Sequence, residues 1–234
     1  MALLDLLRQI SLADWLALAA FMAAWWGYAA FARRRAHGGG SLLATTNHYR
    51  RLWMIQTTAR ENRVIDGVVV QNLSTSPSFF ASTSILIIGG LLAVLGASEE
   101  AAKLVREFPF AARTSTIVFD LKLFVLTAVF VYAFFRFTWS MRQYTFGALL
   151  IASAPDARVF ERGEASRDEF ADRAGRVVGL AAETFNDGLR AYYMAFAVVL
   201  WFYSPFAFAV GTAGIIYLLY QREFRSEVLS VLRP

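Results

Sequence analysis

Cysteine is absent from this chain of 234 residues, which excludes disulfides and cysteine-bound metal sites. Charged residues are also scarce, at 18%, against about 25% in an ordinary soluble domain. The two histidines, His37 and His48, are too few for a multi-histidine metal site within one chain. We therefore predict no bound metal and no cofactor.

Motifs that accompany catalysis are missing too. The sequence has no GxSxG, no HExxH and no phosphate-binding glycine loop. The HGGG at 37–40 is similar to an esterase oxyanion loop, but no nucleophile elbow accompanies it, so we interpret it as a linker. We predict that the protein is not an enzyme.

The positive charge favours a membrane over nucleic acid. The net charge is +5, and lysine is rare: Lys103 and Lys122 are the only two. The arginines lie in connectors beside long apolar runs, as in the cytoplasmic loops of membrane proteins. We therefore expect membrane lipids as partners and no nucleic acid.

Apolar residues are abundant, at 57% of the chain. Four runs are long enough to approach or cross a hydrocarbon core about 30 Å thick. We predict an all-α integral membrane helical bundle, a single domain over 1–234. It has four transmembrane helices and two cytosolic amphipathic helices, with spans at 15–32, 79–97, 117–137 and 191–219. Ser76 and Pro77 are expected to begin the second span, and Pro205 to kink the fourth.

Charge asymmetry predicts the orientation. Arg33, Arg34 and Arg35 follow the first apolar run, which indicates a retained anchor with its N-terminus outside. The connectors 33–78 and 138–190 then carry fourteen arginines on the inside, against seven basic residues outside. We expect a bacterial inner-membrane protein with both termini in the periplasm.

The inner connectors show helical patterns. Thr46 or Asn47 is a candidate cap for an amphipathic helix that runs towards the second span. Ser166 and Glu169 have the spacing of a capping box before a second amphipathic helix, which continues into the fourth span. Residues 1–12 are also amphipathic and suit the membrane interface.

A run of hydroxyl side chains occupies residues 74–84. Ser74, Ser78 and Ser82 are four residues apart, on one face of a helix. Capping, hydrogen bonds to backbone carbonyls and close helix packing account for such a run. Alternatively, in an oligomer, the stripe lines a water-filled path.

Ionisable residues also occur within the third span. Asp120 is in its first turns, and Lys122 is about 10 Å from the start of the run. They cannot pair on one face, because i and i+2 do not face each other, so the partner of Lys122 lies elsewhere. The lysine is either part of a structural ion pair or a site on an ion pathway. Arg136, near the inner end, is expected to snorkel.

Charged residues also concentrate on the inner side. Glu183 and Asp187 are one helical turn apart and repel each other, so they require a counter-charge or a cation. Arg190, Arg60 and Arg63 are candidate partners. The group is either a network that joins the two amphipathic helices or a vestibule that attracts cations; its residues are Arg60, Glu61, Arg63, Asp66, Glu183, Asp187 and Arg190.

Two stretches resemble a bacterial membrane-protein family called domain of unknown function 599. They are HYRRLWMIQTTARENRVIDGVVVQNLSTSPSFFASTSILIIGG and ETFNDGLRAYYMAFAVVLWFYSPF, and TTARENRVIDG is the most specific part. The resemblance covers about residues 10–228. It implies a four-span inner-membrane protein with a large cytosolic loop, and it assigns no activity and no catalytic residue.

Small-residue faces on the first two spans indicate self-association. The leading functional prediction is an oligomeric channel or transporter-like protein that moves small ions or solutes. The alternative is a membrane scaffold or lipid-interacting partner of another complex, whose arginine-rich inner face binds anionic headgroups. An enzyme acting on lipid is disfavoured by the missing motifs.

Overall fold

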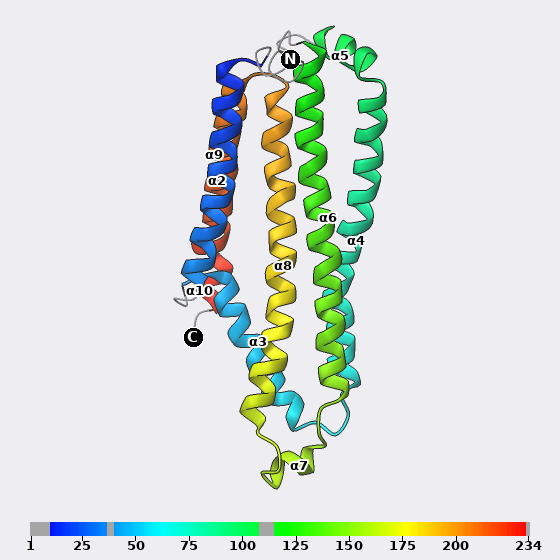
Figure 1. Cartoon of the computed structure of the whole chain (residues 1–234). Coiled ribbons are helices and arrows are strands. Elements are labelled where there is room, and N and C mark those ends of the chain that lie inside the picture. Colours follow the sequence, from blue (N-terminus) through cyan, green and yellow to red (C-terminus); the bar gives the residue numbers. More distant parts are fainter. Residues whose placement is uncertain (1–9, 37–39, 108–114, 233–234) are drawn as a thin grey trace, which may run out of the picture. The chain divides into compact units, whose positions relative to one another are not determined.

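The computed structural model describes residues 10–36, 40–107 and 115–232, and this part of the chain forms helices joined by short turns (Figure 1). Within these ranges no β-strand occurs, so the predicted all-α fold is confirmed. The helices are α2 (Leu12–Ala36), α3 (Leu42–Thr58), α4 (Val64–Gly96), α5 (Ser98–Glu107), α6 (Thr116–Ala152), α7 (Ala157–Glu161), α8 (Arg167–Trp201), α9 (Pro205–Phe224) and α10 (Glu227–Leu232).

Three of these helices, α2, α4 and α6, are long and apolar enough to cross a membrane. A hydrocarbon core about 30 Å thick needs about 20 helical residues. α4 has 33 residues and α6 has 37, so both extend beyond such a core. The third apolar run, whose predicted span ends at residue 137, continues as one helix to Ala152, and Pro155 follows its end.

The predicted fourth span, residues 191–219, is not a single kinked helix. α8 ends at Trp201 and α9 begins at Pro205. Proline has no N–H to continue a helix, but it suits the first position of a new one. The Ser204 hydroxyl caps this start by accepting a hydrogen bond from the Ala207 N–H at 3.0 Å.

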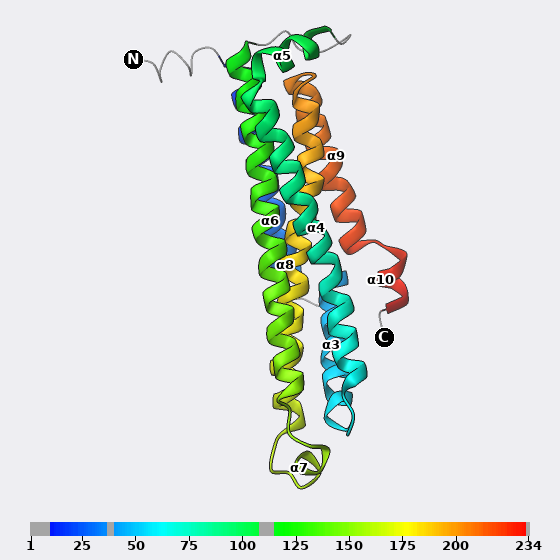
Figure 2. The ribbon, with the colours of Figure 1, turned by 90° about the vertical axis from the view of Figure 1, so that its right-hand side faces the viewer.

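α9 folds back along the end of α8. The Trp201 and Phe208 rings stack with centroids 4.8 Å apart beside the turn. Farther from the turn, Arg222 donates a hydrogen bond to the Tyr193 hydroxyl at 2.8 Å. The two segments therefore run antiparallel, and both views show the reversal of the chain (Figures 1 and 2).

The start of α4 also differs from the prediction. The helix begins at Val64, whose N–H donates to the Asn62 side-chain oxygen at 3.0 Å, and Pro77 lies inside it. Upstream of Pro77, the Ser74 and Thr75 hydroxyls donate to the Gln71 carbonyl at 2.8 and 3.1 Å. These hydroxyls bond their own helix, as serine and threonine do in apolar helices.

The helices of the two inner connectors agree only in part with those predicted from the sequence. The cap of α3 is Ser41, which accepts from the Ala44 N–H at 3.1 Å, rather than Thr46 or Asn47. At the start of α8, the Glu169 N–H donates to the predicted cap, Ser166, at 3.2 Å. The sequence did not predict α5. The predicted interfacial segment 1–12 and linker 37–40 lie mostly outside the described residues.

The chain divides into two compact units. The first comprises Met1–Ala32, Thr83–Ala133 and Leu189–Arg222, and the second comprises Arg33–Ser82, Phe134–Gly188 and Glu223–Pro234. Aromatic contacts join the helices of the first unit. They include Phe21 with Phe208, at 5.0 Å between ring centroids, and Trp25 with Tyr132, at 5.6 Å.

The second unit has an apolar core supplied by α3, α4, α6 and α8. Its buried side chains include Met54, Val70, Tyr144 and Val178. Beside this core, α10 lies on α3, where the Tyr49 hydroxyl donates to the Leu232 carbonyl at 3.0 Å. At the end of α9, Glu223 accepts from the Leu43 N–H of α3 at 3.2 Å.

The C-terminal segment contacts the 33–78 connector through Tyr49 with Leu232 and through Leu43 with Glu223. The predicted arrangement, with one span after residue 190 between these two segments, does not account for this contact. If the three C-terminal arginines, Arg222, Arg225 and Arg233, are counted with the connectors, fourteen against seven basic residues become seventeen against four. The membrane side on which the termini lie stays a prediction.

Candidate functional site

The predicted hydroxyl stripe does not enclose a path within one chain. Ser74 and Ser78 are half-buried, and Ser82 is exposed. The buried hydroxyl of the run is that of Ser84 in the first unit, which shares a 2.8 Å hydrogen bond with the Tyr192 hydroxyl. A path along the predicted stripe therefore requires a second copy of the chain.

A different line of residues is exposed along α4. Its members alternate at spacings of three and four, which is the seam of a left-handed helix pair. We call this line the α4 seam; it comprises Ile65, Val68, Asn72, Thr75, Phe79, Ser82, Leu86, Gly89, Ala93 and Gly96, all exposed. Ser82 belongs both to this seam and to the predicted stripe.

Lys122 is almost completely buried in the first unit, with 1% of its surface exposed. Its ammonium group donates to the Trp201 carbonyl at 2.9 Å and lies 5.6 Å from the centroid of the Trp201 ring. Trp201 is the last residue of α8, where carbonyl groups have no partner within the helix. The lysine thus caps the negative end of α8.

Asp14 completes this buried cluster. The Trp201 indole N–H donates to one carboxylate oxygen at 2.6 Å, and the Ser11 hydroxyl donates to the other at 2.6 Å. Asp14 also attracts Lys122 electrostatically. Neither Asp14 nor Trp201 was predicted from the sequence as part of a site. The predicted neighbour, Asp120, is half-buried, and its Oδ1 has no hydrogen-bond partner among the described residues.

Asp66 is the best-connected predicted residue of the second unit and is fully buried. Its Oδ1 accepts hydrogen bonds from the Trp53 indole at 2.6 Å and the Thr57 hydroxyl at 3.1 Å, and it forms an ion pair with Arg60. Its position in the first turn of α4 also suits the positive end of that helix. Asp66 therefore fixes the corner between α3 and α4.

Two other predicted residues lie near this corner. Arg63 donates to the Ala154 carbonyl at 2.7 Å and to the Pro155 carbonyl, so it binds the end of α6 to the corner. Glu61 is exposed. The guanidinium groups of Arg60 and Arg63 thus donate hydrogen bonds at this corner.

The acidic pair on α8 has other arginine partners. Glu183 accepts from Arg176 at 3.2 Å and from the Asn47 amide at 3.4 Å. Asp187 forms an ion pair with Arg136, which therefore does not snorkel freely. Arg190 is buried in the first unit, with its guanidinium 5.7 Å from the centroid of the Tyr28 ring.

Two glycines bring α3 close to α8, a feature that the sequence analysis overlooked although GRVVG has the small-xxx-small spacing. A Cβ at Gly175 would lie 3.2 Å from the Arg51 Cα, and one at Gly179 would lie 2.9 Å from the Asn47 side-chain oxygen. Beside this contact Arg50 donates to Asn47 at 2.7 Å. Burial lowers the pKa of the Arg50 guanidinium below its usual value.

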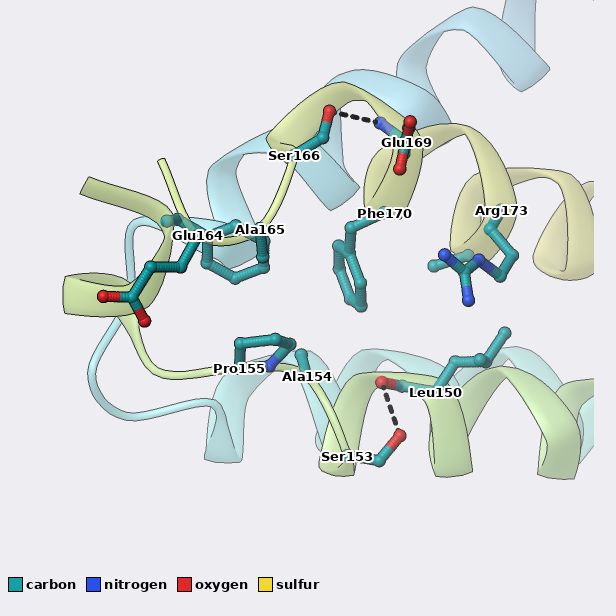
Figure 3. Close-up of a pocket in the computed structure, with 12 residues that line it drawn as sticks. Leu150, Ser153, Ala154, Pro155, Glu164, Ala165, Ser166, Glu169, Phe170 and Arg173 are labelled. Atoms are coloured by element: carbon teal, nitrogen blue, oxygen red, sulfur yellow. Dashed lines mark hydrogen bonds between the residues drawn. The ribbon is translucent and has the colours of Figure 1, made fainter. Parts of the chain in front are cut away.

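A pocket of about 300 Å³ lies between the end of α6, α7 and the start of α8 (Figure 3). The Phe170 ring points into it, and Pro155 and Leu150 face it from the α6 side. Glu164, Glu169 and Arg173 add charges of both signs. Among the described residues, no group of three or more histidine, cysteine or acidic side chains is placed to bind a metal.

These features define an all-α protein with three helices able to cross a membrane, a buried polar cluster in one unit and an arginine–carboxylate network in the other. The chain belongs to the family described as "Protein of unknown function, DUF599", whose model matches residues 16–228. This confirms the resemblance found in the sequence. No curated protein and no solved structure matches the chain.

Proposed function

We propose that the protein is a homo-oligomeric membrane channel in which copies of α4 surround a common axis. The observation that supports this proposal is the α4 seam, whose ten residues are exposed in a single chain from Ile65 to Gly96. The polar members of the seam, Asn72, Thr75 and Ser82, would line the path for small ions or solutes. The proposal requires no catalytic residue.

The length of the α4 seam indicates that another protein surface, rather than lipid alone, contacts it. α4 has 33 residues, which is about 50 Å of helix, while the hydrocarbon core is about 30 Å thick. The first turn of α4 follows the charged residues Arg60, Glu61 and Arg63. Ile65 and Val68, which are 67% and 54% exposed there, thus lie outside the hydrocarbon and need another protein surface.

The hairpin of α8 and α9 extends this proposal to the membrane topology. We place five helix passes in a bacterial inner membrane, with α2, α4, α6, the end of α8 and α9 crossing in turn. The N-terminus is then periplasmic, and α3, α7 and α10 are cytoplasmic, which agrees with the seventeen-to-four distribution of basic residues. Reporter fusions after residue 234 and within 37–40 should report the same compartment.

Particle mass and ion flux together test the channel. The protein in mild detergent should have the mass of several copies, and vesicles containing it should leak ions. Gly89→Leu adds bulk to the seam, where a Cβ meets nothing within 4 Å in one chain, so it should lower the mass without disturbing the fold. Gly214→Leu on α9, also in open space, is the matched control.

The lining is tested separately by Ser82→Leu, which should reduce the leak while the particle mass is retained. A strictly monomeric particle would exclude an axial path. A stable oligomer that passes no ion or solute under any gradient would instead favour the scaffold function.

A further inference from the structure

An open apolar groove of about 630 Å³ runs between α2 and α9 in the first unit. Its floor consists of small residues, including Gly27 and Ala213, and a Cβ at Gly27 would meet nothing within 4 Å. Aromatic rings form its sides, and Phe31 and Tyr217 are 41% and 64% exposed. The groove is therefore hollow, apolar and open at the surface of the unit.

The two walls run in the same direction. Phe21 contacts Phe208 near one end, and Phe31 lies 6.3 Å from Tyr220, between ring centroids, near the other. The residue numbers on α2 and α9 thus increase together. Consequently, the ends of both helices that follow Phe31 and Tyr220 lie at one mouth of the groove.

That mouth is basic. On α9, Arg222 follows Tyr220 by two residues and is exposed. Behind the wall, the buried Arg190 guanidinium lies against the Tyr28 ring, which lines the groove. An apolar groove that ends at a guanidinium group matches an acyl chain that ends at a phosphate.

We propose that this groove binds one anionic phospholipid, with an acyl chain between α2 and α9 and the phosphate at Arg222. α2 is a candidate membrane span, so its outer surface meets lipid in any orientation across a bilayer. The basic end of α2 is also the end that the charge asymmetry places in the cytoplasm, where anionic lipids attract basic residues. This site is independent of the α4 seam.

Native mass spectrometry of the full chain tests the site. The protein is extracted from vesicles that contain equal amounts of phosphatidylglycerol and phosphatidylcholine, and the retained lipid is identified. Wild type should retain phosphatidylglycerol preferentially. Arg222→Gln should lower this preference about fivefold, as expected for one basic residue near a headgroup. Equal retention of the two lipids by wild type would overturn the proposal.

Filling the groove gives the second arm of the test. Gly27→Leu should abolish most lipid retention, because its side chain extends into the space of the acyl chain, and a Cβ at this position meets nothing within 4 Å. Gly214→Leu, on α9 but outside the groove lining, should retain lipid like wild type. Unchanged lipid in Gly27→Leu would overturn the proposal. A lower particle mass in Gly27→Leu, with lipid unchanged, would assign the groove to a second copy of the chain.

Discussion

The two units are built partly from the same helices but are stabilised by different interactions. In the first unit, aromatic rings join the helices, and Asp14, Lys122 and Trp201 form a buried polar cluster. In the second unit, arginine–carboxylate pairs connect α3, α4, α6 and α8 around an apolar core. The part of α8 in the first unit therefore packs through aromatic side chains, whereas the part in the second unit forms ion pairs. This difference is expected when one part of a helix lies in lipid and the other in water.

The largest expected effect lies in the second unit, at Asp66. Asp66→Leu removes the acceptor shared by Trp53, Thr57 and Arg60, so it should destabilise the protein by about 3 kcal/mol. The thermal unfolding midpoint in detergent measures the loss. The neighbouring exposed Glu61→Gln should leave the midpoint unchanged; equal shifts in both variants would show that Asp66 does not fix the corner.

The next effect tests the buried cluster of the first unit. Lys122→Met keeps the length of the side chain but leaves the Trp201 carbonyl without its donor, which should cost about 2 kcal/mol. Lys103→Met, at the chain's other lysine, is exposed and should have no effect on the unfolding midpoint.

Ion flux separates the two roles predicted for Lys122. A lysine that only caps α8 should change the stability and leave the flux per folded protein unaltered. A changed flux would assign Lys122 to the pathway.

A smaller effect is expected where α3 approaches α8 in the second unit. Gly175→Val places methyl groups against the Arg51 backbone, and such overpacking typically costs about 1–3 kcal/mol. Gly67→Val is the matched control, because a Cβ at Gly67 meets nothing within 4 Å. If both variants unfold at the wild-type temperature, the close approach of α3 does not contribute to stability.

The smallest effect should come from the exposed ion pairs of Arg51. Hydrogen bonds to Asp172 and Asp168 raise the pKa of Arg51 above its usual value. Because the pKa is raised, this contribution is present below the unfolded pKa of Arg51, as long as the aspartates are ionised, and is lost only as the pH rises through the folded pKa. Arg51→Gln should therefore lower the unfolding midpoint equally at about pH 6 and pH 9, by less than Gly175→Val does. A strong pH dependence over this range would contradict the assignment.

The sequence predicted the all-α class, the three long apolar helices and the cap at Ser166, because each depends on local pattern. It failed at Pro205 and Pro77. Pro205 begins a new helix after a turn, where the Ser204 hydroxyl caps the start of α9, whereas Pro77 lies inside α4, where neighbouring hydroxyls bond to their own helix.

The candidate sites were harder to predict, because they depend on contacts between distant segments. Lys122 is distinctive in the sequence, but its partner Trp201 is 79 positions away and contributes a backbone carbonyl, which no side-chain pattern reveals. Similarly, Arg136 and Asp187 are 51 positions apart. The α4 seam was overlooked because the hydroxyl run favours a spacing of four, whereas the exposed residues follow a spacing of three and four.

The contact between α10 and α3 has a consequence for biosynthesis. Tyr49 and the Leu232 carbonyl are 183 positions apart, so α3 leaves the ribosome long before its covering segment exists. During translation the surface of α3 that receives α10 therefore stays open until residues 227–232 have left the ribosome. The second unit reaches its final form only after that point, and a chain truncated before α10 would leave the surface available to chaperones or proteases.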